Sequence, residues 1–87
     1  MTLFYTYIAY NKLNSFKGVG VTNNLKRRFK LLNQLNKKKK CKLVYYEEYT
    51  ERLLAIKREK VLNAFPENSL RELCLENNPM LVDLLKK

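Results

Sequence analysis

The chain has 87 residues, a length that predicts a single domain spanning residues 1–87 with a modest core. It has no histidine, and its two cysteines, Cys41 and Cys74, form no CxxC pair, which excludes a Cys/His zinc site and a histidine general base. The net charge of +10 is concentrated between Met1 and Tyr46, a half that contains no acidic residue but 11 of the 18 lysines and arginines. Such asymmetry predicts a polyanionic partner, nucleic acid above all, with a general solubility charge as the alternative.

The first two segments predict a β-hairpin. Residues Leu3 to Tyr10 are rich in aromatic and β-branched side chains, as strands are. This apolar start is too short for a signal peptide or a membrane span, and two isolated thiols suit a reducing compartment, so we expect a cytoplasmic location. After a turn, Phe16 to Val21 form the second strand, in which Gly18 and Gly20 indicate a bulge or a close backbone approach.

A helix is predicted from about Asn24 to about Asn36, with Asn23 or Asn24 as its cap. Four apolar residues at helical spacing predict its buried stripe: Leu25, Phe29, Leu32 and Leu35. Arg28 projects inside that stripe. A guanidinium stays charged, so Arg28 either reaches solvent along the edge of the stripe or holds a carboxylate or a phosphate.

The loop from Lys37 to Lys40 carries four like charges and leads directly into a strand. It is either a solvated linker or one wall of a groove for a nucleic-acid backbone. On the second interpretation, the candidate nucleic-acid-binding residues are Lys17, Lys26, Arg27, Lys30, Lys37, Lys38, Lys39 and Lys40.

The second half predicts one strand and three helices. The expected elements are a strand over Lys42–Tyr49, a helix over Glu51–Ala64 capped by Thr50, a helix over Glu67–Glu76 after Pro66, and a short helix over Pro79–Leu85. In the first of these helices we expect Leu54, Val61 and Phe65 to form the buried stripe, with Ala55 and Leu62 on its flank. The element order is therefore β-β-α-β-α-α-α, an α+β fold in which helices pack on a small antiparallel sheet.

Glu59 falls at the edge of the buried stripe of its helix, as Arg28 does on the first helix. The two residues predict either a structural ion pair or a site where Glu59 holds a divalent metal and Arg28 holds a phosphate. In both cases we expect Arg28 and Glu59 to face one cleft, on the sheet face that carries Tyr5 and Tyr7.

These residues, taken in order, resemble the GIY-YIG nuclease superfamily, and in particular its small, stand-alone UvrC-type members, which are related to DNA-repair nucleases. The residues and segments that carry the resemblance are Tyr5-Thr6-Tyr7, Gly18-Val19-Gly20, Thr22, Leu25, Arg28, Leu43 to Tyr49, Ala55, Lys57 to Lys60, Glu76 to Pro79, and Asp83-Leu84.

The resemblance implies a three-stranded antiparallel sheet flanked by helices and metal-dependent cleavage of phosphodiester bonds, with Mg²⁺ or Mn²⁺ as cofactor and DNA in preference to RNA as substrate. It implies that Tyr7 is the tyrosine of the first motif, that Arg28 steadies the phosphate and that Glu59 binds the metal. Two positions depart from the family pattern: Gly18 replaces a tyrosine, and Leu32 replaces a frequent histidine. Lys17, beside Gly18, is a further candidate for the proton-handling role if a bulge turns it inward.

The sequence thus leaves three functions open. The first is a metal-dependent endonuclease with weakened activity, which the retained Arg28 and Glu59 favour. The second is a catalytically inactive nucleic-acid-binding module of nuclease descent, which Gly18 and Leu32 favour. The third is an α/β protein whose basic half binds a protein partner.

Overall fold

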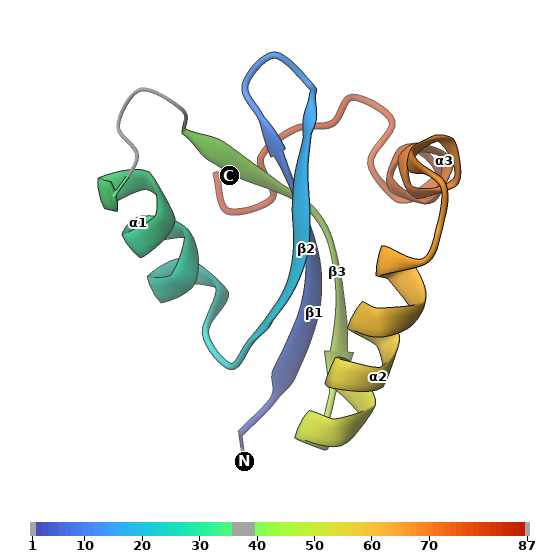
Figure 1. The fold of residues 1–87 in the computed structure, drawn as a ribbon. Helices are drawn as coiled ribbons and strands as arrows, with labels where there is room; N and C mark the ends of the chain where they lie inside the picture. The colour runs from blue at the N-terminus through green and yellow to red at the C-terminus, as the bar shows by residue number, and fades with distance from the viewer. Residues whose placement is uncertain (1, 36–39, 87) are drawn as a thin grey trace.

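The computed structural model describes residues 2–35 and 40–86, which form a three-stranded antiparallel sheet and three helices. The elements are β1 (Phe4–Asn11), β2 (Phe16–Thr22), α1 (Leu25–Leu35), β3 (Cys41–Tyr49), α2 (Arg52–Asn63) and α3 (Glu67–Asn77). The strand order is β2-β1-β3, so β1 is central and β2 lies at one edge. Figure 1 shows α1 on one side of this sheet and α2 with α3 on the other. The predicted α+β class is confirmed.

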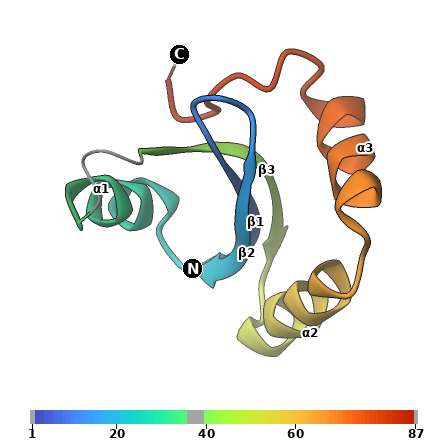
Figure 2. The same cartoon turned by 45° about the horizontal axis from the view of Figure 1, so that its top comes forward.

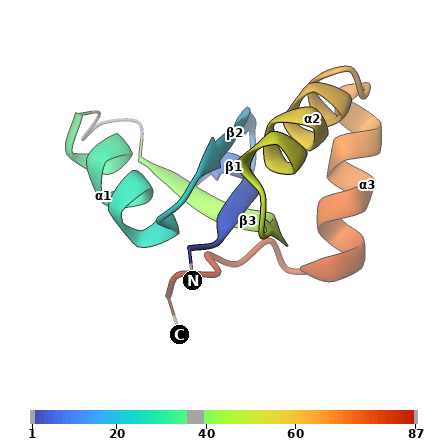
Figure 3. The same ribbon diagram turned by 90° about the horizontal axis from the view of Figure 1, so that it is seen from below.

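The alternation of side chains along β1 divides the interior into two cores. Tyr7 and Ala9 point toward α1 and pack with Phe29 in one cluster. Ile8 and Tyr10 point the other way and join the cluster of α2 and α3. The two helical layers therefore cover opposite faces, as the view from below also shows (Figure 3).

A bulge in the hairpin lies at Lys17. Ala9 pairs with Gly18 and Tyr10 pairs with Phe16, so Lys17 is an extra residue without a partner on β1. The bulge keeps Phe16 in the cluster of α2 and α3, beside Tyr10. It also brings Lys17 beside Gly18 at the lining of a cavity on the α1 face. The predicted bulge in β2 is confirmed and lies at Lys17 itself, while Lys17 lines this cavity as an exposed residue.

The first three of the four predicted helices are confirmed, but the buried stripes of α1 and α2 differ from the prediction. On α1, Phe29 is buried and Leu25 and Leu32 pack against it, whereas Leu35 is 85% exposed because α1 extends beyond the sheet there. Asn24 caps this helix, since its side-chain oxygen accepts a 3.0 Å hydrogen bond from the Arg27 amide.

The stripe predicted for α2 is wrong for Leu54 and Val61, and only Phe65, just after the helix, packs against the core. Ala55 and Leu62 are fully buried, whereas Leu54 and Val61 are exposed. The small side chain of Ala55 lets the helix approach β1 closely, and the Thr6 hydroxyl donates a 2.7 Å hydrogen bond to the Ala55 carbonyl. This contact sets the rotation of α2. The predicted Thr50 cap is also wrong, because the N-cap residue is Glu51.

The rotation of α2 explains Arg58. Its guanidinium donates two hydrogen bonds to the Glu47 carboxylate, at 2.9 and 3.1 Å, and the carboxylate also accepts hydrogen bonds from Tyr45 and Tyr49. Burial raises the pKa of Glu47, but the hydrogen bonds from Arg58, Tyr45 and Tyr49 outweigh it, so the net shift is downward. This network joins α2 to β3.

The predicted helix over Pro79–Leu85 is wrong; the segment contains only turns. The Asn78 side chain bonds the carbonyls of Val44 and Val82 instead of capping a helix, and Leu81 has a φ of 48°. The Leu84 amide then donates a 2.9 Å hydrogen bond to the Leu43 carbonyl. The segment thus passes from the α3 side of the sheet, around β3, to the α1 side (Figure 2). Within the described residues, none of the helices is long and apolar enough to cross a membrane.

Candidate active site

Arg28 is held by the central strand. Its Nε donates a 3.1 Å hydrogen bond to the Tyr7 hydroxyl, while the rest of the side chain is exposed. Tyr7 is buried and packs edge-on against Phe29, with ring centroids 5.2 Å apart. Neither terminal nitrogen of Arg28 has a hydrogen-bond partner within residues 2–35 and 40–86. Arg28 therefore presents a free, pre-oriented donor pair to solvent, an arrangement that suits a phosphate.

The glycines of β2 make room for this contact. A Cβ at Gly20 would lie 2.5 Å from the Tyr7 hydroxyl oxygen, so only glycine lets the Tyr7 ring cross β2 at this point. Gly18 is different, because a Cβ there would meet nothing within 4 Å.

The space beside Gly18 is a cavity of about 240 Å³, which we call the Gly18 hollow. The residues that line it are Tyr7, Ala9, Lys17, Gly18, Val19, Arg28, Leu32 and Cys41. Burial raises the pKa of the Cys41 thiol, although the charges of Lys17 and Arg28 act in the opposite direction. The hollow thus brings Tyr7, Lys17 and Arg28 together beside the glycine.

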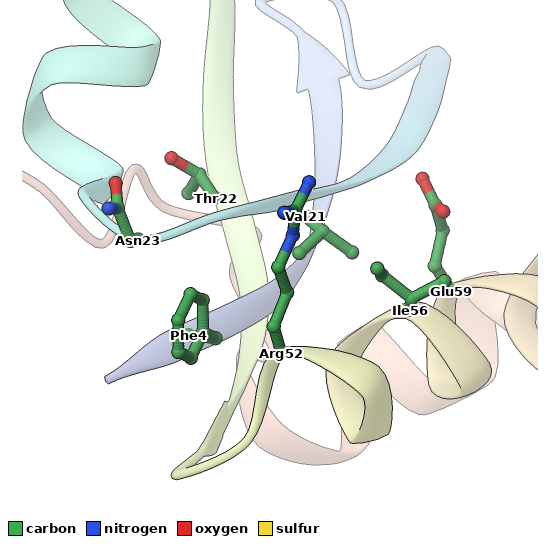
Figure 4. Close-up of a pocket in the computed structure, with 7 residues that line it drawn as sticks. All are labelled: Phe4, Val21, Thr22, Asn23, Arg52, Ile56 and Glu59. Carbon is green, nitrogen blue, oxygen red and sulfur yellow. The ribbon is translucent and has the colours of Figure 1, made fainter. Parts of the chain in front are cut away.

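Glu59 lies in a second cavity, of about 490 Å³, which we call the Glu59 pocket. Its lining residues are Phe4, Val21, Thr22, Asn23, Arg52, Ile56 and Glu59, and Figure 4 shows Arg52 and Glu59 extending from α2 toward β2. The Glu59 carboxylate has no hydrogen-bond or ion-pair partner among the described residues. No signal in the sequence pointed to Arg52, because only the folded structure places the start of α2 beside β2.

Arg28 and Glu59 lie on opposite faces of the sheet. Arg28 contacts Tyr7 on the α1 face, whereas Glu59 lies beside Val21, which pairs with Thr6 and faces α2. The prediction of one cleft on the face of Tyr5 and Tyr7 is therefore wrong, and an ion pair between Arg28 and Glu59 is excluded. Both residues nevertheless flank the same end of β2, near Gly20 and Val21, so a site that uses both must extend around the β2 edge.

Comparison with protein-family models identifies the family to which this chain belongs. The model of the GIY-YIG catalytic domain matches residues 3–64, which include the whole sheet, α1 and α2. The chain belongs to the GIY-YIG family. Comparisons with the curated proteins and with the solved structures found no match.

Membership of the GIY-YIG family indicates a nuclease domain whose partner is nucleic acid. The match ends before α3, so the likeness to small UvrC-type members, which partly rested on Glu76 to Pro79 and Asp83-Leu84, stays a prediction. The family roles of Tyr7, Arg28 and Glu59 also stay predictions.

GIY-YIG nucleases generally depend on a divalent metal. No cluster of three or more potential metal-ligating His, Cys, Asp or Glu residues occurs in the described part of the chain. Mg²⁺ does not need one, because it commonly keeps several waters and binds one or two carboxylates together with substrate phosphates. The open, unpaired Glu59 carboxylate fits this mode of binding, and Glu59 is the residue that would hold the metal.

The basic residues predicted to bind nucleic acid are exposed where the structure describes them. This holds for Lys17, Lys26, Arg27, Lys30 and Lys40, while Lys37, Lys38 and Lys39 lie outside the described residues. None of the five forms an ion pair with a described acidic residue. Lys26 and Lys30 on α1 are therefore available for phosphate groups, while Arg27 donates a 3.0 Å hydrogen bond to the Asn23 side chain.

Proposed function

We propose that this GIY-YIG domain is a metal-dependent endonuclease that cleaves DNA phosphodiester bonds, with activity weakened by Gly18 and Leu32. The observation that carries the proposal is the Arg28–Tyr7 hydrogen bond, which orients the Arg28 guanidinium beside β2. The Glu59 carboxylate approaches the same end of β2 from the other face of the sheet.

In this proposal the scissile phosphate lies against the β2 edge. Arg28 binds it from the α1 side through its terminal nitrogens, and Arg52 approaches from the α2 side. Glu59 holds the metal, which when bound stabilises the charge on the phosphate and the departing oxygen. Because β2 is an edge strand, groups on both faces of the sheet can approach a phosphate at its outer edge.

The proton-handling role falls to Tyr7 or Lys17. In the family pattern a tyrosine stands where this chain has Gly18, and the Gly18 hollow is open there. Loss of a proton-handling group commonly costs about two to four orders of magnitude in rate. Tyr7 keeps its hydroxyl beside Arg28, and Lys17 lines the same hollow.

The decisive experiment is nicking of supercoiled plasmid in Mg²⁺ or Mn²⁺, with wild type beside Glu59→Ala. We expect slow nicking by wild type that EDTA abolishes and that Glu59→Ala reduces at least about 100-fold. Glu72→Ala is the matched control, because Glu72 is an exposed glutamate on α3. Equal nicking by Glu59→Ala and wild type contradicts the assigned site.

The second candidate function is a catalytically inactive nucleic-acid-binding module, and the empty space at Gly18 favours it. In that case the wild type binds DNA but cuts no more than Glu59→Ala does. Both candidates are consistent with the expected cytoplasmic location and with a role in DNA repair, which the small UvrC-type members suggest.

A further inference from the structure

A groove runs along the α1 face of the sheet, beyond the N-terminal end of α1. Two adjoining cavities of about 470 and 320 Å³ form it, and both are lined by Tyr5, Leu25, Lys26 and Leu85. The larger cavity is also lined by Leu43, Tyr46, Glu48 and Leu84. We call this surface the tyrosine groove, and the only functional role given above to a residue that lines it is nucleic-acid binding by Lys26.

Its floor consists of two aromatic rings. Tyr5 and Tyr46 pack edge to face, with ring centroids 5.9 Å apart and planes at 71°. Tyr46 is 40% exposed, and neither phenol has a hydrogen-bond partner within residues 2–35 and 40–86. Exposed tyrosine rings on a sheet are the surfaces on which single-stranded nucleic-acid binders stack bases.

The groove lies on the same face of the sheet as Tyr7, whose hydroxyl accepts the hydrogen bond from Arg28. Tyr46 pairs directly with Tyr7, and Tyr5 lies two residues before Tyr7 on the same face of β1, about 7 Å along the strand. A nucleic-acid strand whose phosphate is bound by Arg28 could therefore place a nearby base at the two tyrosines on this face.

The edges of the groove carry one charge of each sign. Lys26 and Glu48 are exposed, and neither has an ion-pair partner among the described residues. Leu85 closes the far side, and the chain before it is held to β3 by the hydrogen bond from Leu84 to Leu43. The tyrosine rings offer a surface for a nucleobase, and Lys26 offers a positive charge for a phosphate. The Glu48 carboxylate can accept a hydrogen bond from the amino group of a base such as cytosine or adenine.

We propose that the tyrosine groove binds an unpaired nucleobase next to the phosphate held by Arg28, so that the substrate is single-stranded or locally unpaired DNA. Bases inside an intact duplex are stacked on each other and cannot reach Tyr5 and Tyr46 without being extruded. The inference rests on the proposed function for the position of the phosphate, but base binding itself requires no cleavage.

The test measures binding in EDTA, where metal-dependent cleavage cannot occur. The probes are a fluorescein-labelled single-stranded DNA, a blunt duplex of the same sequence and a fully abasic strand of the same length. We expect wild type to bind the single strand about 5- to 150-fold more tightly than the abasic strand, the range typical of one stacked base. The Tyr46→Ala variant should bind the single strand and the abasic strand with similar affinity. The Tyr46→Phe variant keeps the ring and should retain the wild-type preference for the strand that carries bases.

Two further arms separate base binding from phosphate binding. Lys30→Ala should weaken all three probes by a similar factor, because Lys30 lies on α1 away from the groove. Glu48→Gln should remove a preference for oligo-dC over oligo-dT.

The outcomes distinguish this inference from the proposed function. If Tyr46→Ala keeps the wild-type preference for bases, or if the wild type binds the duplex at least as tightly as the single strand, the inference is overturned. It is also overturned if sedimentation shows a dimer that Tyr46→Ala dissociates, since the groove is then an interface. Absence of Glu59-dependent nicking would instead overturn the proposed function and leave the base-binding result standing.

Discussion

The Nε of Arg28 donates a 3.1 Å hydrogen bond to the Tyr7 hydroxyl, and this contact joins the first helix to the central strand of the sheet. It gives the exposed Arg28 side chain a fixed anchor, so that its terminal nitrogens need no further ordering when a phosphate binds. Tyr7 in turn occupies the space that Gly20 leaves on β2.

Tyr7→Phe removes the anchor of Arg28 and the nearest hydroxyl. We expect nicking to fall at least about 100-fold while the fold is retained, because the ring still packs on Phe29 and Gly20. Plasmid nicking and circular dichroism measure the two effects. Tyr49→Phe, on the opposite face, is the matched control. If Tyr7→Phe cuts as well as wild type, Lys17 takes the proton-handling role, and Lys17→Ala should then abolish nicking.

Alanine substitutions at Gly18 and Gly20 should have opposite effects on the stability of the fold. At Gly20 the new Cβ would meet the Tyr7 phenol at 2.5 Å, which predicts a loss of about 1–3 kcal/mol in the free energy of unfolding. At Gly18 the Cβ meets open space, so Gly18→Ala should be neutral or stabilise the protein by up to about 1 kcal/mol. Urea unfolding of both variants measures the difference. Equal destabilisation by both would show that the Tyr7 ring does not cross β2 at Gly20.

Gly18→Tyr should raise the nicking rate. The Gly18 hollow offers space for a phenol beside Tyr7, Lys17 and Arg28, at the position where family members carry a tyrosine. We expect a gain of roughly 10- to 100-fold, below the full effect of a proton-handling group because Leu32 remains. Gly18→Phe is the control, since it adds the ring without the hydroxyl. If Gly18→Phe raises the nicking rate as much as Gly18→Tyr does, the increase comes from packing of the ring and not from the hydroxyl.

DNA affinity should fall steeply with salt. The exposed cations of the acid-free half predict a log–log slope of roughly −0.9 for each phosphate neutralised on duplex DNA. Alanine at Lys37, Lys38, Lys39 and Lys40 together should make the slope less negative by up to roughly 3.6. The control replaces Lys57, Lys60 and Lys86, in the nearly neutral half. Fluorescence anisotropy over a salt series gives the slopes, and an affinity independent of salt would contradict phosphate binding.

The Glu47–Arg58 network should contribute stability that acid removes. Because the pKa of Glu47 is lower in the folded chain than its usual value near 4.5, its contribution is complete above that value. It is lost as the pH falls through the lower, folded pKa. Glu47→Gln should therefore cost about 1–3 kcal/mol at pH 7 and progressively less as the pH falls below about 4.5. Thermal unfolding of both proteins over this pH range measures the difference, and a cost independent of pH would exclude the ionic contribution.

Local sequence determined the elements and their order. Aromatic and β-branched runs produced the three strands, Asn24 starts α1, and Pro66 separates α2 from α3. These features act within a few residues along the chain, so they can be predicted without knowing which elements meet. Tyr7, Arg28 and Glu59 could be selected as candidates for the same reason, because each stands out from its own strand or helix.

Tertiary structure decided which of these residues meet. Glu59 lies across the sheet from Arg28 because α1 and α2 pack on opposite faces of the sheet, and helical periodicity alone does not specify which face a helix covers. Lys17 reaches the Gly18 hollow only because the bulge keeps Phe16 in the core of α2 and α3. Such placements depend on pairings between residues far apart in the chain, and their energies enter only when the sheet and its two helical layers assemble.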